Sequence, residues 1–348
     1  MAIRKNRRWL LASRPAGDFD ESTFKLDAAP VPEPKEGEVL VHNIWLSLDP
    51  YMRGRMRDVK SYVPPVPLGG VMEGGTVGEV IESRNPNFKT GDMVEERLGW
   101  QDYGISNGKG MRKIDPALAP ISTAVGVLGM PGMTAYFGLL EVGQMKAGET
   151  VVVSAASGAV GGLVGQIARI KGAKRVVGIA GGKAKCDYCV KELGYDACID
   201  YQPLGRDWTK LVDGLKPALP DGVDVYFDNV GSWISDAVHP LINVKARIAI
   251  CGMIAEYNLE KPELAPRPTR FLLVNRARME GFIIFDFRQR FGEALEEMSA
   301  WIKSGKLKYR EDIVDGLENA PRALMRLFKG ENFGKQLVRI RPDPTRRG

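Results

Sequence analysis

Between residues 150 and 250 the chain alternates short apolar runs with segments of helical periodicity. The β-branched run from Val151 to Val153 is typical of a buried parallel strand. After a turn of small residues, apolar side chains recur at helical spacing at positions Val160, Leu163, Val164, Ile167 and Ile170. Further strands are expected at 175–180, 197–200, 223–227 and 246–251, with helices between most of them. This rhythm predicts an α/β domain built on a doubly wound parallel sheet.

Residues 1–128 follow a different pattern. Extended runs at 38–47 and 75–82 are separated by stretches rich in proline and glycine, which favours antiparallel strands joined by tight turns. The tail at 336–341 has the pattern of a late strand that returns to this β-rich part. We therefore expect two domains: 1–128 completed by 310–348, and 129–309.

Composition narrows the function classes. The chain has 348 residues, of which 44% are hydrophobic and 26% charged, as in globular proteins that are neither fibrous nor disordered. No apolar run approaches the roughly 18–20 residues of a membrane span, and we expect no secretory leader. Four cysteines favour a reducing compartment, with the cytoplasm as the expected location. The net charge of +6 is dispersed along the chain, so nucleic acid is not an expected partner.

The turn after the first strand of the α/β part carries Ala156-x-Gly158-x-x-Gly161, a variant of the dinucleotide-binding fingerprint. Gly158 would let backbone N–H groups approach a pyrophosphate, which a helix N-terminus favours. Gly161 would let the helix and the strand pack closely. The motif includes Ala159 and Val160, and it predicts a dinucleotide site.

The end of the next strand indicates which dinucleotide is bound. In NAD-binding folds an acidic residue at this place binds the ribose 2′-hydroxyl. Here residues 180–185 contain no carboxylate and carry Lys183 and Lys185. A 2′-phosphate is repelled by an acid and attracted by an ammonium group, so NADP(H) is expected rather than NAD. The alternative is that both lysines are solvated surface charges.

Metal chemistry is not expected. His42 and His239 are the two histidines of the chain, so few imidazole side chains are present for a zinc site or a catalytic triad. Cys186-x-x-Cys189 has the spacing of a metal or redox pair, but a zinc ribbon needs a second pair and Cys198 and Cys251 are single. We expect a structural role for this pair, in a helix over 185–193.

Several segments together resemble one known family. The segments are 46–53 (LSLDPYMR), 129–139 (GMPGMTAYFGL), 155–161 (AASGAVG), 226–231 (YFDNVG), 250–253 (ICGM) with Tyr257 and Asn258, and 329–335 (KGENFGK). The chain resembles the zinc-independent medium-chain dehydrogenase/reductases, in the branch of alkenal double-bond reductases, prostaglandin reductases and bacterial curcumin reductase. The resemblance implies a GroES-like β-rich catalytic domain followed by a Rossmann domain. Unlike the zinc-dependent relatives, the chain has no histidine in 68–75 and no cysteine in 90–115.

The resemblance also implies roles for individual residues. It assigns the 2′-phosphate of NADP(H) to Lys185, Tyr201 and Asn332, with Lys183 as a possible substitute for Lys185. It assigns catalysis to Tyr257, a phenol facing the nicotinamide, with Tyr51 as a second tyrosine of the substrate site. Further residues expected along the cofactor are Met133, Thr134, Asn229, Gly231, Cys251 and Gly252.

The function implied is the NADPH-dependent reduction of the carbon–carbon double bond of an α,β-unsaturated ketone or aldehyde, without a metal. Hydride reaches the β-carbon, and a tyrosine stabilises the enolate. The alternatives are a quinone reductase or an NADP-linked alcohol dehydrogenase of the same fold, and a non-enzymatic cofactor-binding protein. Loops that include Phe282, Phe285 and Phe287 suggest a bulky, partly apolar enone as the small-molecule substrate. Relatives commonly join their Rossmann sheets edge to edge, so a homodimer is expected.

Overall fold

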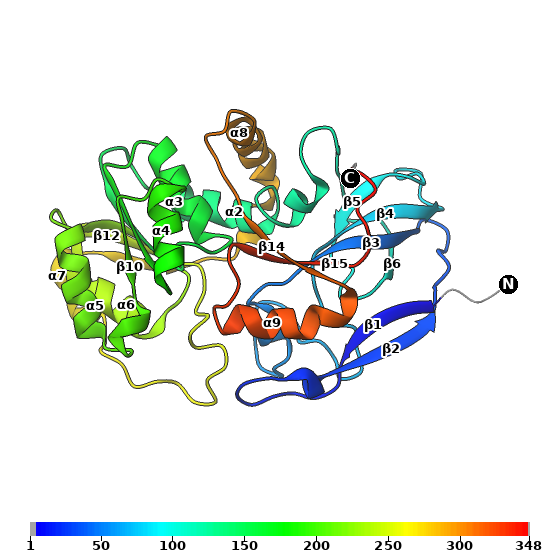
Figure 1. Cartoon of the computed structure of the whole chain (residues 1–348), viewed down its shortest axis with the longest axis horizontal. Coiled ribbons are helices and arrows are strands. Elements are labelled where there is room, and N and C mark those ends of the chain that lie inside the picture. The colour runs from blue at the N-terminus through cyan, green and yellow to red at the C-terminus, as the bar shows by residue number, and fades with distance from the viewer. Residues whose placement is uncertain (1–4, 347–348) are drawn as a thin grey trace. The chain divides into compact units, whose positions relative to one another are not determined.

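The computed structural model describes residues 5–346, which form two compact units. The first unit contains the described residues up to Gly126 and those from Glu311 onward. The second unit contains Val127–Arg310. Figure 1 shows the elements of both units, coloured along the chain.

The first unit is mainly β-structure. Its strands are β1 (Lys5–Leu11), β2 (Phe24–Pro30), β3 (Val39–Ser47), β4 (Thr76–Ser83), β5 (Met93–Glu96), β6 (Tyr103–Ser106), β7 (Arg112–Lys113), β14 (Glu311–Asp315) and β15 (Lys335–Arg339). Its helices are α1 (Met52–Arg55) and α9 (Ala320–Phe328), with 3-10 turns η1 (Glu21–Thr23), η2 (Ile121–Val125) and η8 (Leu317–Asn319). The β-rich texture expected from the sequence is confirmed.

The C-terminal segment supplies two strands of the larger sheet of this unit. The larger sheet has the order β14-β15-β3-β4-β5-β7, with β6 also paired to β3, while β1 and β2 form a separate antiparallel pair. Leu337 of β15 pairs with Ser47 of β3 in antiparallel register. The last strand of the chain is therefore an interior strand of the N-terminal sheet.

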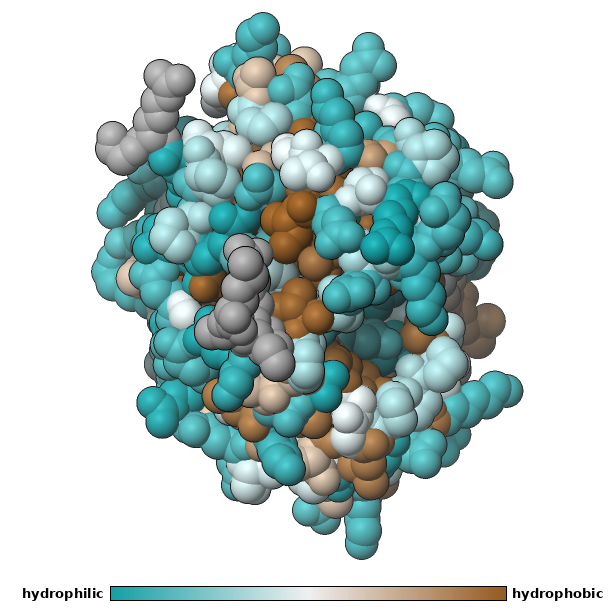
Figure 2. Space-filling view, turned by 90° about the vertical axis from the view of Figure 1, so that its right-hand side faces the viewer, coloured by the Kyte–Doolittle hydropathy of each residue, from teal (hydrophilic) through white to brown (hydrophobic). Residues whose placement is uncertain are grey.

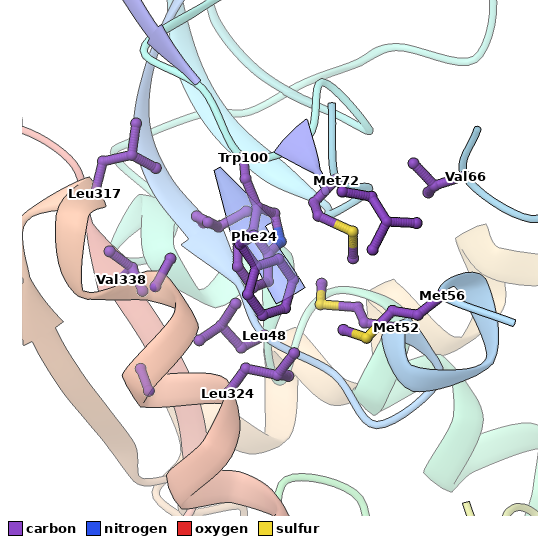
Figure 3. Close-up of a cluster of buried hydrophobic side chains, with 14 of the residues drawn as sticks. Phe24, Leu48, Met52, Met56, Val66, Met72, Trp100, Leu317, Leu324 and Val338 are labelled. Carbon is purple, nitrogen blue, oxygen red and sulfur yellow. The ribbon is translucent and has the colours of Figure 1, made fainter. Parts of the chain in front are cut away.

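A buried hydrophobic cluster joins the N-terminal and C-terminal parts of this unit (Figure 3). Phe24 stacks on Trp100 with ring centroids 5.3 Å apart, and both lie beside methionines at the start of α1. Leu324 of α9 and Val338 of β15 complete the cluster from the C-terminal side. Because these side chains are fully buried, their transfer from water stabilises the attachment of residues 311–346, at about 25 cal/mol per Å² of apolar surface.

The second unit alternates strands and helices. Its strands are β8 (Thr150–Ser154), β9 (Arg175–Ala180), β10 (Ala197–Asp200), β11 (Val223–Asp228), β12 (Ile242–Ile250) and β13 (Arg278–Gly281). Its α-helices are α2 (Met130–Phe137), α3 (Gly161–Ile170), α4 (Lys183–Lys191), α5 (Trp208–Leu215), α6 (Ser232–Val238), α7 (Thr269–Asn275) and α8 (Phe291–Lys303). Shorter helical turns are η3 (Gly138–Val142), η4 (Gln202–Leu204), η5 (Lys216–Ala218), η6 (His239–Leu241) and η7 (Ile284–Arg290).

The six strands form one parallel sheet in the order β10-β9-β8-β11-β12-β13, which confirms the doubly wound prediction. Alternate side chains of the strands, such as Val152 and Tyr226, pack in one core with residues of α5, α6 and α7. On the other face, Phe227 meets Gly138 of η3 and the ring of Phe282. The central strands β8, β9 and β11 are thus buried by helices, as their apolar sequences require, while β10 and β13 at the two edges are more exposed.

Two element boundaries differ from the sequence prediction. β12 begins at Ile242 rather than at residue 246, because the backbone of Lys245 has a φ of 66° and the pairing with β11 shifts register between Val223 and Val225. This irregularity interrupts the apolar pattern in the first half of the strand. The helix expected over 185–193 is α4, Lys183–Lys191, which begins directly after Gly182 at a φ of 89°.

Figure 2 shows one face, on which hydrophilic residues predominate and hydrophobic residues show between them. Among the described residues, no helix has the length and apolar character needed to cross a membrane.

Candidate active site

The strand order of the second unit reverses between β8 and β11. In doubly wound sheets, ligands bind in the crevice outside the carboxyl ends of the strands at such a switch point. β8 ends at Ser154 and β11 at Asp228, and the Ser154 hydroxyl donates a hydrogen bond to Asp228 Oδ1 at 3.0 Å. The two strand ends that define the switch point are therefore joined directly.

Asp228 organises this edge of the sheet. Its carboxylate is 3% exposed and accepts hydrogen bonds from the hydroxyls of Ser154, Tyr226 and Ser235 and from the backbone N–H groups of Val230 and Gly231, all at 2.8–3.0 Å. A buried carboxylate with this many donors is a structural centre, because each donor would otherwise lose a partner. Sequence analysis missed Asp228, although a carboxylate that ends an apolar strand ahead of Asn-Val-Gly was the available signal.

Asn229 is held by the same arrangement. Its side-chain amide donates to the Ser154 carbonyl at 2.7 Å, and its backbone N–H donates to the Ser154 hydroxyl at 2.8 Å. The predicted cofactor residues Asn229 and Gly231 thus both lie at the switch point, next to the carboxyl end of β8.

The glycine turn between β8 and α3 has the geometry that the motif predicts for close packing. A Cβ at Gly161 would lie 2.3 Å from the carbonyl oxygen of Ala155, a distance that no side chain tolerates. Ala155 itself has a left-handed φ of 49°, and Ala156 is fully buried. Gly158 is less crowded, since its Cβ would lie 3.1 Å from the same carbonyl. Ala159 and Val160 are partly exposed at the end of this turn, directly before α3.

Lys185 and Tyr201 lie at one corner of the sheet. β9 and β10 pair so that Ala180 is opposite Asp200, and the next residues of both strands form the corner. A Cβ at Gly181 would lie 2.8 Å from the Tyr201 hydroxyl, while the backbone N–H of Lys185 donates to the Gly182 carbonyl at 3.1 Å. The ring of Tyr201 also contacts Trp233 edge to face at a centroid distance of 6.0 Å.

The two lysines that are candidates for binding the 2′-phosphate, Lys183 and Lys185, differ in exposure and in ion pairing. The exposed ammonium group of Lys183 forms an ion pair with Asp187 at 2.7 Å on the same helix, whereas Lys185 is partly buried beside the corner. Asp200 is also present, but its Oδ1 accepts the backbone N–H groups of Gly182 and Gln202 at 2.8 and 3.0 Å. Burial and the nearby Asp200 raise the pKa of Tyr201, so this phenol stays neutral and can donate a hydrogen bond.

Tyr257 lies against the backbone at the carboxyl end of β12. Its hydroxyl oxygen accepts the N–H of Met253 at 3.3 Å, and a Cβ at Gly252 would lie 3.3 Å from that oxygen and 3.5 Å from the Asn229 carbonyl. The N–H groups of Cys251 and Gly252 donate to the Asp228 carbonyl at 2.8 and 3.2 Å. The phenol predicted to be catalytic is therefore placed beside the predicted cofactor residues of β11 and β12.

Burial determines the protonation state of the neighbouring Cys251 thiol. It raises the pKa of Cys251 to about 12, with a further contribution from Asp228. The thiol therefore stays protonated at neutral pH and serves as a small apolar lining group.

Two carboxylates fasten the loop of Tyr257 to the start of α6. Glu256 accepts the backbone N–H of Ser232 at 2.9 Å, while Glu263 binds the Ser232 hydroxyl and the Arg206 guanidinium. Burial, together with Glu256 and Glu263, raises the pKa of Asp236 in α6 to about 6. These contacts give the loop after β12 a defined position in the second unit.

Two predicted cofactor residues of the second unit are buried in α2. Met133 and Thr134 are 2% and 9% exposed, and the Thr134 hydroxyl donates to the Met130 carbonyl one turn earlier at 2.7 Å. Of the three phenylalanines expected near the substrate, Phe282 contacts Phe227 and Phe287 stacks on Phe137 at 5.2 Å. Phe285 is the exposed one.

Tyr51 and Asn332 belong to the first unit. Tyr51 follows Pro50 at the start of α1, and its ring is partly buried against the hydrophobic cluster of Figure 3. Burial raises the pKa of Tyr51, and the nearby Asp49 raises it further. Asn332 is buried and its side-chain amide donates to the Gly334 carbonyl at 2.9 Å.

Among residues 5–346, no three His, Cys, Asp or Glu side chains are arranged to hold a metal ion. The pair Cys186 and Cys189 is buried on one side of α4, and the carboxylates that are buried elsewhere in the site bind protein donors.

Comparison with known families defines the class. Residues 7–114 match a family described as the N-terminal domain of oxidoreductase, and residues 159–300 match one described as zinc-binding dehydrogenase. These two domains in this order are those of the medium-chain dehydrogenases and reductases, with the GroES-like and Rossmann folds.

Individual relatives narrow the class. The chain is 48% identical over 347 residues to the NADPH-dependent curcumin reductase of Escherichia coli, covering 98% of both chains. It is 46% identical over 314 residues to the NADP-dependent 2-alkenal reductase of Nicotiana tabacum, covering 89% of both. Its structure matches that of CurA from Vibrio vulnificus in complex with NADPH at a TM-score of 0.91 and 45% identity, covering 97% of this chain and 100% of that one.

The protein therefore belongs to the medium-chain dehydrogenase/reductase family, in the branch of curcumin, prostaglandin and 2-alkenal reductases. The resemblance inferred from the sequence motifs is confirmed.

Proposed function

We propose that the protein reduces the carbon–carbon double bond of α,β-unsaturated ketones and aldehydes with NADPH. The observation that carries the proposal is the position of the Tyr257 phenol, at the carboxyl end of β12 beside Gly252 and the Asn229 carbonyl. Its oxygen accepts the backbone N–H of Met253 at 3.3 Å, and a phenol carries the kind of O–H donor that an enolate oxygen needs. The relatives named above act with NADPH or NADP, which agrees with this reading.

The second unit offers a fitting place for NADPH. The turn of Ala156, Gly158 and Gly161 brings backbone to the start of α3, where a pyrophosphate is favoured, and Lys185 with Tyr201 supplies a cation and a donor for the 2′-phosphate. Asn332, the third residue that the resemblance assigns to the 2′-phosphate, has its amide bound to Gly334 in the first unit. When bound, NADPH supplies the hydride that reduces the β-carbon.

The protein's own residues then handle charge and proton. Negative charge develops on the carbonyl oxygen of the substrate as the enolate forms, and we assign its stabilisation to the Tyr257 hydroxyl. The α-carbon must then gain a proton, for which Tyr51 is the second phenol of the proposed site. Burial raises the pKa of Tyr51 above the ~10 of an unperturbed phenol, so this group is a neutral donor at pH 7.

The test is NADPH oxidation with a series of conjugated enones, in parallel with NADH and in the presence of a chelator. We expect oxidation that is specific to NADPH, resists the chelator and yields the saturated carbonyl. Faster turnover of quinones or alcohols than of any enone would assign one of the alternative reactions instead. Tight NADPH binding without turnover of any panel member would assign a non-enzymatic role.

We further propose that the protein is a homodimer. β13 is the edge strand of the parallel sheet, and open edges favour pairing with another chain. Nearby, α7 exposes Leu273 and Val274 at 78% and 59%. Light scattering coupled to gel filtration should give the mass of a dimer, and a Leu273→Glu change should produce monomers.

We also propose a cytoplasmic location. All four cysteines are free thiols, and a reducing compartment keeps them so. Fractionation of cells that express the protein would test this, and recovery from an oxidising compartment would contradict it.

A further inference from the structure

The ring of Tyr51 lies near two arginines of the first unit. The guanidinium carbon of Arg55 is 5.7 Å from the ring centroid, and that of Arg97 is 5.6 Å from it. Arg55 comes from α1 and is 1% exposed, while Arg97 follows β5 and is 36% exposed. Cation–π contact of this kind orients an aromatic ring as well as attracting it.

One carboxylate anchors both arginines. Glu73 Oε2 lies 3.4 Å from Arg55 Nε and 3.1 Å from Arg97 Nη2. Arg55 has further partners, since it donates to the Val63 carbonyl at 3.0 Å and lies over the Tyr62 ring at 4.5 Å. Arg55 is thus fixed by the protein interior, whereas Arg97 is the more exposed member of the pair.

The Arg97 guanidinium also interacts electrostatically with the Tyr51 phenol and favours its ionised form. The other charged groups near this phenol include two carboxylates, Glu73 and Asp49, which disfavour a phenolate. Asp49 is largely neutralised by its ion pair with the buried Lys335 at 2.8 Å. Arg97, whose guanidinium carbon is 5.6 Å from the ring centroid, is therefore the cation that can stabilise negative charge on the phenol.

We infer that Arg97 is a positioning residue for Tyr51, holding its ring in place and stabilising the phenolate that forms when Tyr51 gives up its proton. The inference rests on the proposed function. In the step, the O–H bond of Tyr51 breaks and a C–H bond forms at the α-carbon of the enolate. The electron pair of the O–H bond stays on the phenolate oxygen beside Arg97, and solvent returns a proton to it.

The test compares four enzymes in a cycle: wild type, Arg97→Met, Tyr51→Phe and the double variant. We expect Arg97→Met to lower kcat about tenfold with KM for the enone changed less than about twofold, because the interaction strengthens as charge develops. The solvent deuterium isotope effect on kcat should rise, since proton transfer becomes slower. In the Tyr51→Phe background, Arg97→Met should lower kcat less than about twofold.

Two further variants serve as controls. Arg97→Lys keeps the cation and should recover part of kcat, while Arg84→Met removes an exposed arginine that pairs with Glu82 at 3.7 Å and should leave kcat unchanged. An equal loss from Arg97→Met in both backgrounds, with an unchanged isotope effect, would mean that Arg97 does not act through Tyr51. That result would overturn the inference.

A second readout does not depend on activity. In protein labelled with 3-fluorotyrosine, the ¹⁹F resonance of Tyr51 is assigned by its absence from Tyr51→Phe. Arg97→Met should shift this resonance, and Arg84→Met should not. If the wild type reduces no enone, the proposed function fails, and the resonance then decides separately whether Arg97 holds the phenol. An unshifted resonance overturns the inference.

Discussion

The hydroxyl of Ser154 donates to the carboxylate of Asp228 across the point where the strand order of the parallel sheet reverses. The two residues are 74 positions apart in sequence, and each ends its strand. The same carboxylate accepts the N–H groups that lead into the 229–231 turn. One buried side chain thus fixes the edge of the sheet on which the proposed cofactor residues lie.

Replacement of Asp228 by alanine should destabilise the protein by about 3 kcal/mol, because several buried donors lose their acceptor at once. Urea unfolding would measure the loss. Asp221→Ala is the matched control, since Asp221 forms an exposed ion pair with Lys174 at 2.8 Å and exposed pairs contribute less than about 1 kcal/mol. Equal losses from the two variants would contradict a central role for Asp228.

Alanine substitutions at the two glycines of the turn before α3 should have different effects, one on stability and the other on NADPH binding. Gly161→Ala places a Cβ 2.3 Å from the Ala155 carbonyl and should cost about 1–3 kcal/mol of stability. Gly158→Ala meets that carbonyl at 3.1 Å, so it should unfold nearly as the wild type does, yet it should bind NADPH less tightly because its Cβ occupies the approach of the pyrophosphate. Unfolding curves and NADPH titrations of both variants test this. Undiminished NADPH affinity in Gly158→Ala would remove Gly158 from the cofactor site.

Much of this fold is predictable from sequence, and the reason is local. Val151 to Val153 form a buried β-branched run, and the glycine turn and the helical spacing that follow it leave one arrangement for β8 and α3. The first half of β12 was not predictable, because the left-handed φ of Lys245 breaks the alternation on which the prediction depends.

Residues of the candidate site can be predicted from sequence only where a motif or a position after a strand marks the residue by itself. Lys185 and Tyr257 are predicted as site residues by position relative to strands and by resemblance. The role of Asp228 depends on Ser154, and that of Arg97 on Tyr51 and Glu73, and these pairings join distant segments of the chain. Contacts of this kind arise from the packing of strands and leave no pattern in either segment alone.

Lys185→Ala should weaken NADPH binding by roughly 1–2 kcal/mol, about tenfold in the dissociation constant, with little effect on NADH. The reason is that the ammonium group would pair with the 2′-phosphate, which NADH lacks. Lys183→Ala is the control, because Lys183 is exposed and paired with Asp187. Titration of each variant with both nucleotides gives the affinities. Equal losses for NADPH and NADH would show that Lys185 does not read the 2′-phosphate, and a larger effect of Lys183→Ala would transfer that role to Lys183.

Tyr257→Phe should lower kcat about tenfold or more and change KM for the enone little. Phenylalanine keeps the ring beside Gly252 and removes the donor needed by the enolate. Steady-state kinetics with a single enone measure both constants. Tyr103→Phe, which alters a phenol stacked on His42 in the first unit, should leave them unchanged. An unaltered kcat in Tyr257→Phe would exclude this phenol from the mechanism.

The raised pKa of Asp236 predicts a variant that is more stable than the wild type at neutral pH. Burial and the carboxylates of Glu256, Glu263 and Asp228 raise this pKa to about 6, whereas in the unfolded chain it is near ~3.9. The folded state binds this proton more tightly than the unfolded state does. The free energy of unfolding therefore falls as the pH rises from the unfolded pKa to the folded pKa, and the full loss is present above about pH 6. The shift corresponds to at most about 3 kcal/mol, which we reduce to about 1 kcal/mol because the side chain is partly exposed.

Asp236→Asn removes the ionisation and keeps the shape. It should therefore raise the free energy of unfolding by about 1 kcal/mol at about pH 7–8, and the gain should vanish as the pH falls below about 3, where the wild-type carboxyl is protonated in both states. Urea unfolding at a series of pH values measures the difference. Asp213→Asn, at an exposed position paired with Lys216, should show no such dependence on pH. A gain for Asp236→Asn that is constant with pH, or that grows toward low pH, would mean that burial and the nearby carboxylates do not raise the pKa of Asp236.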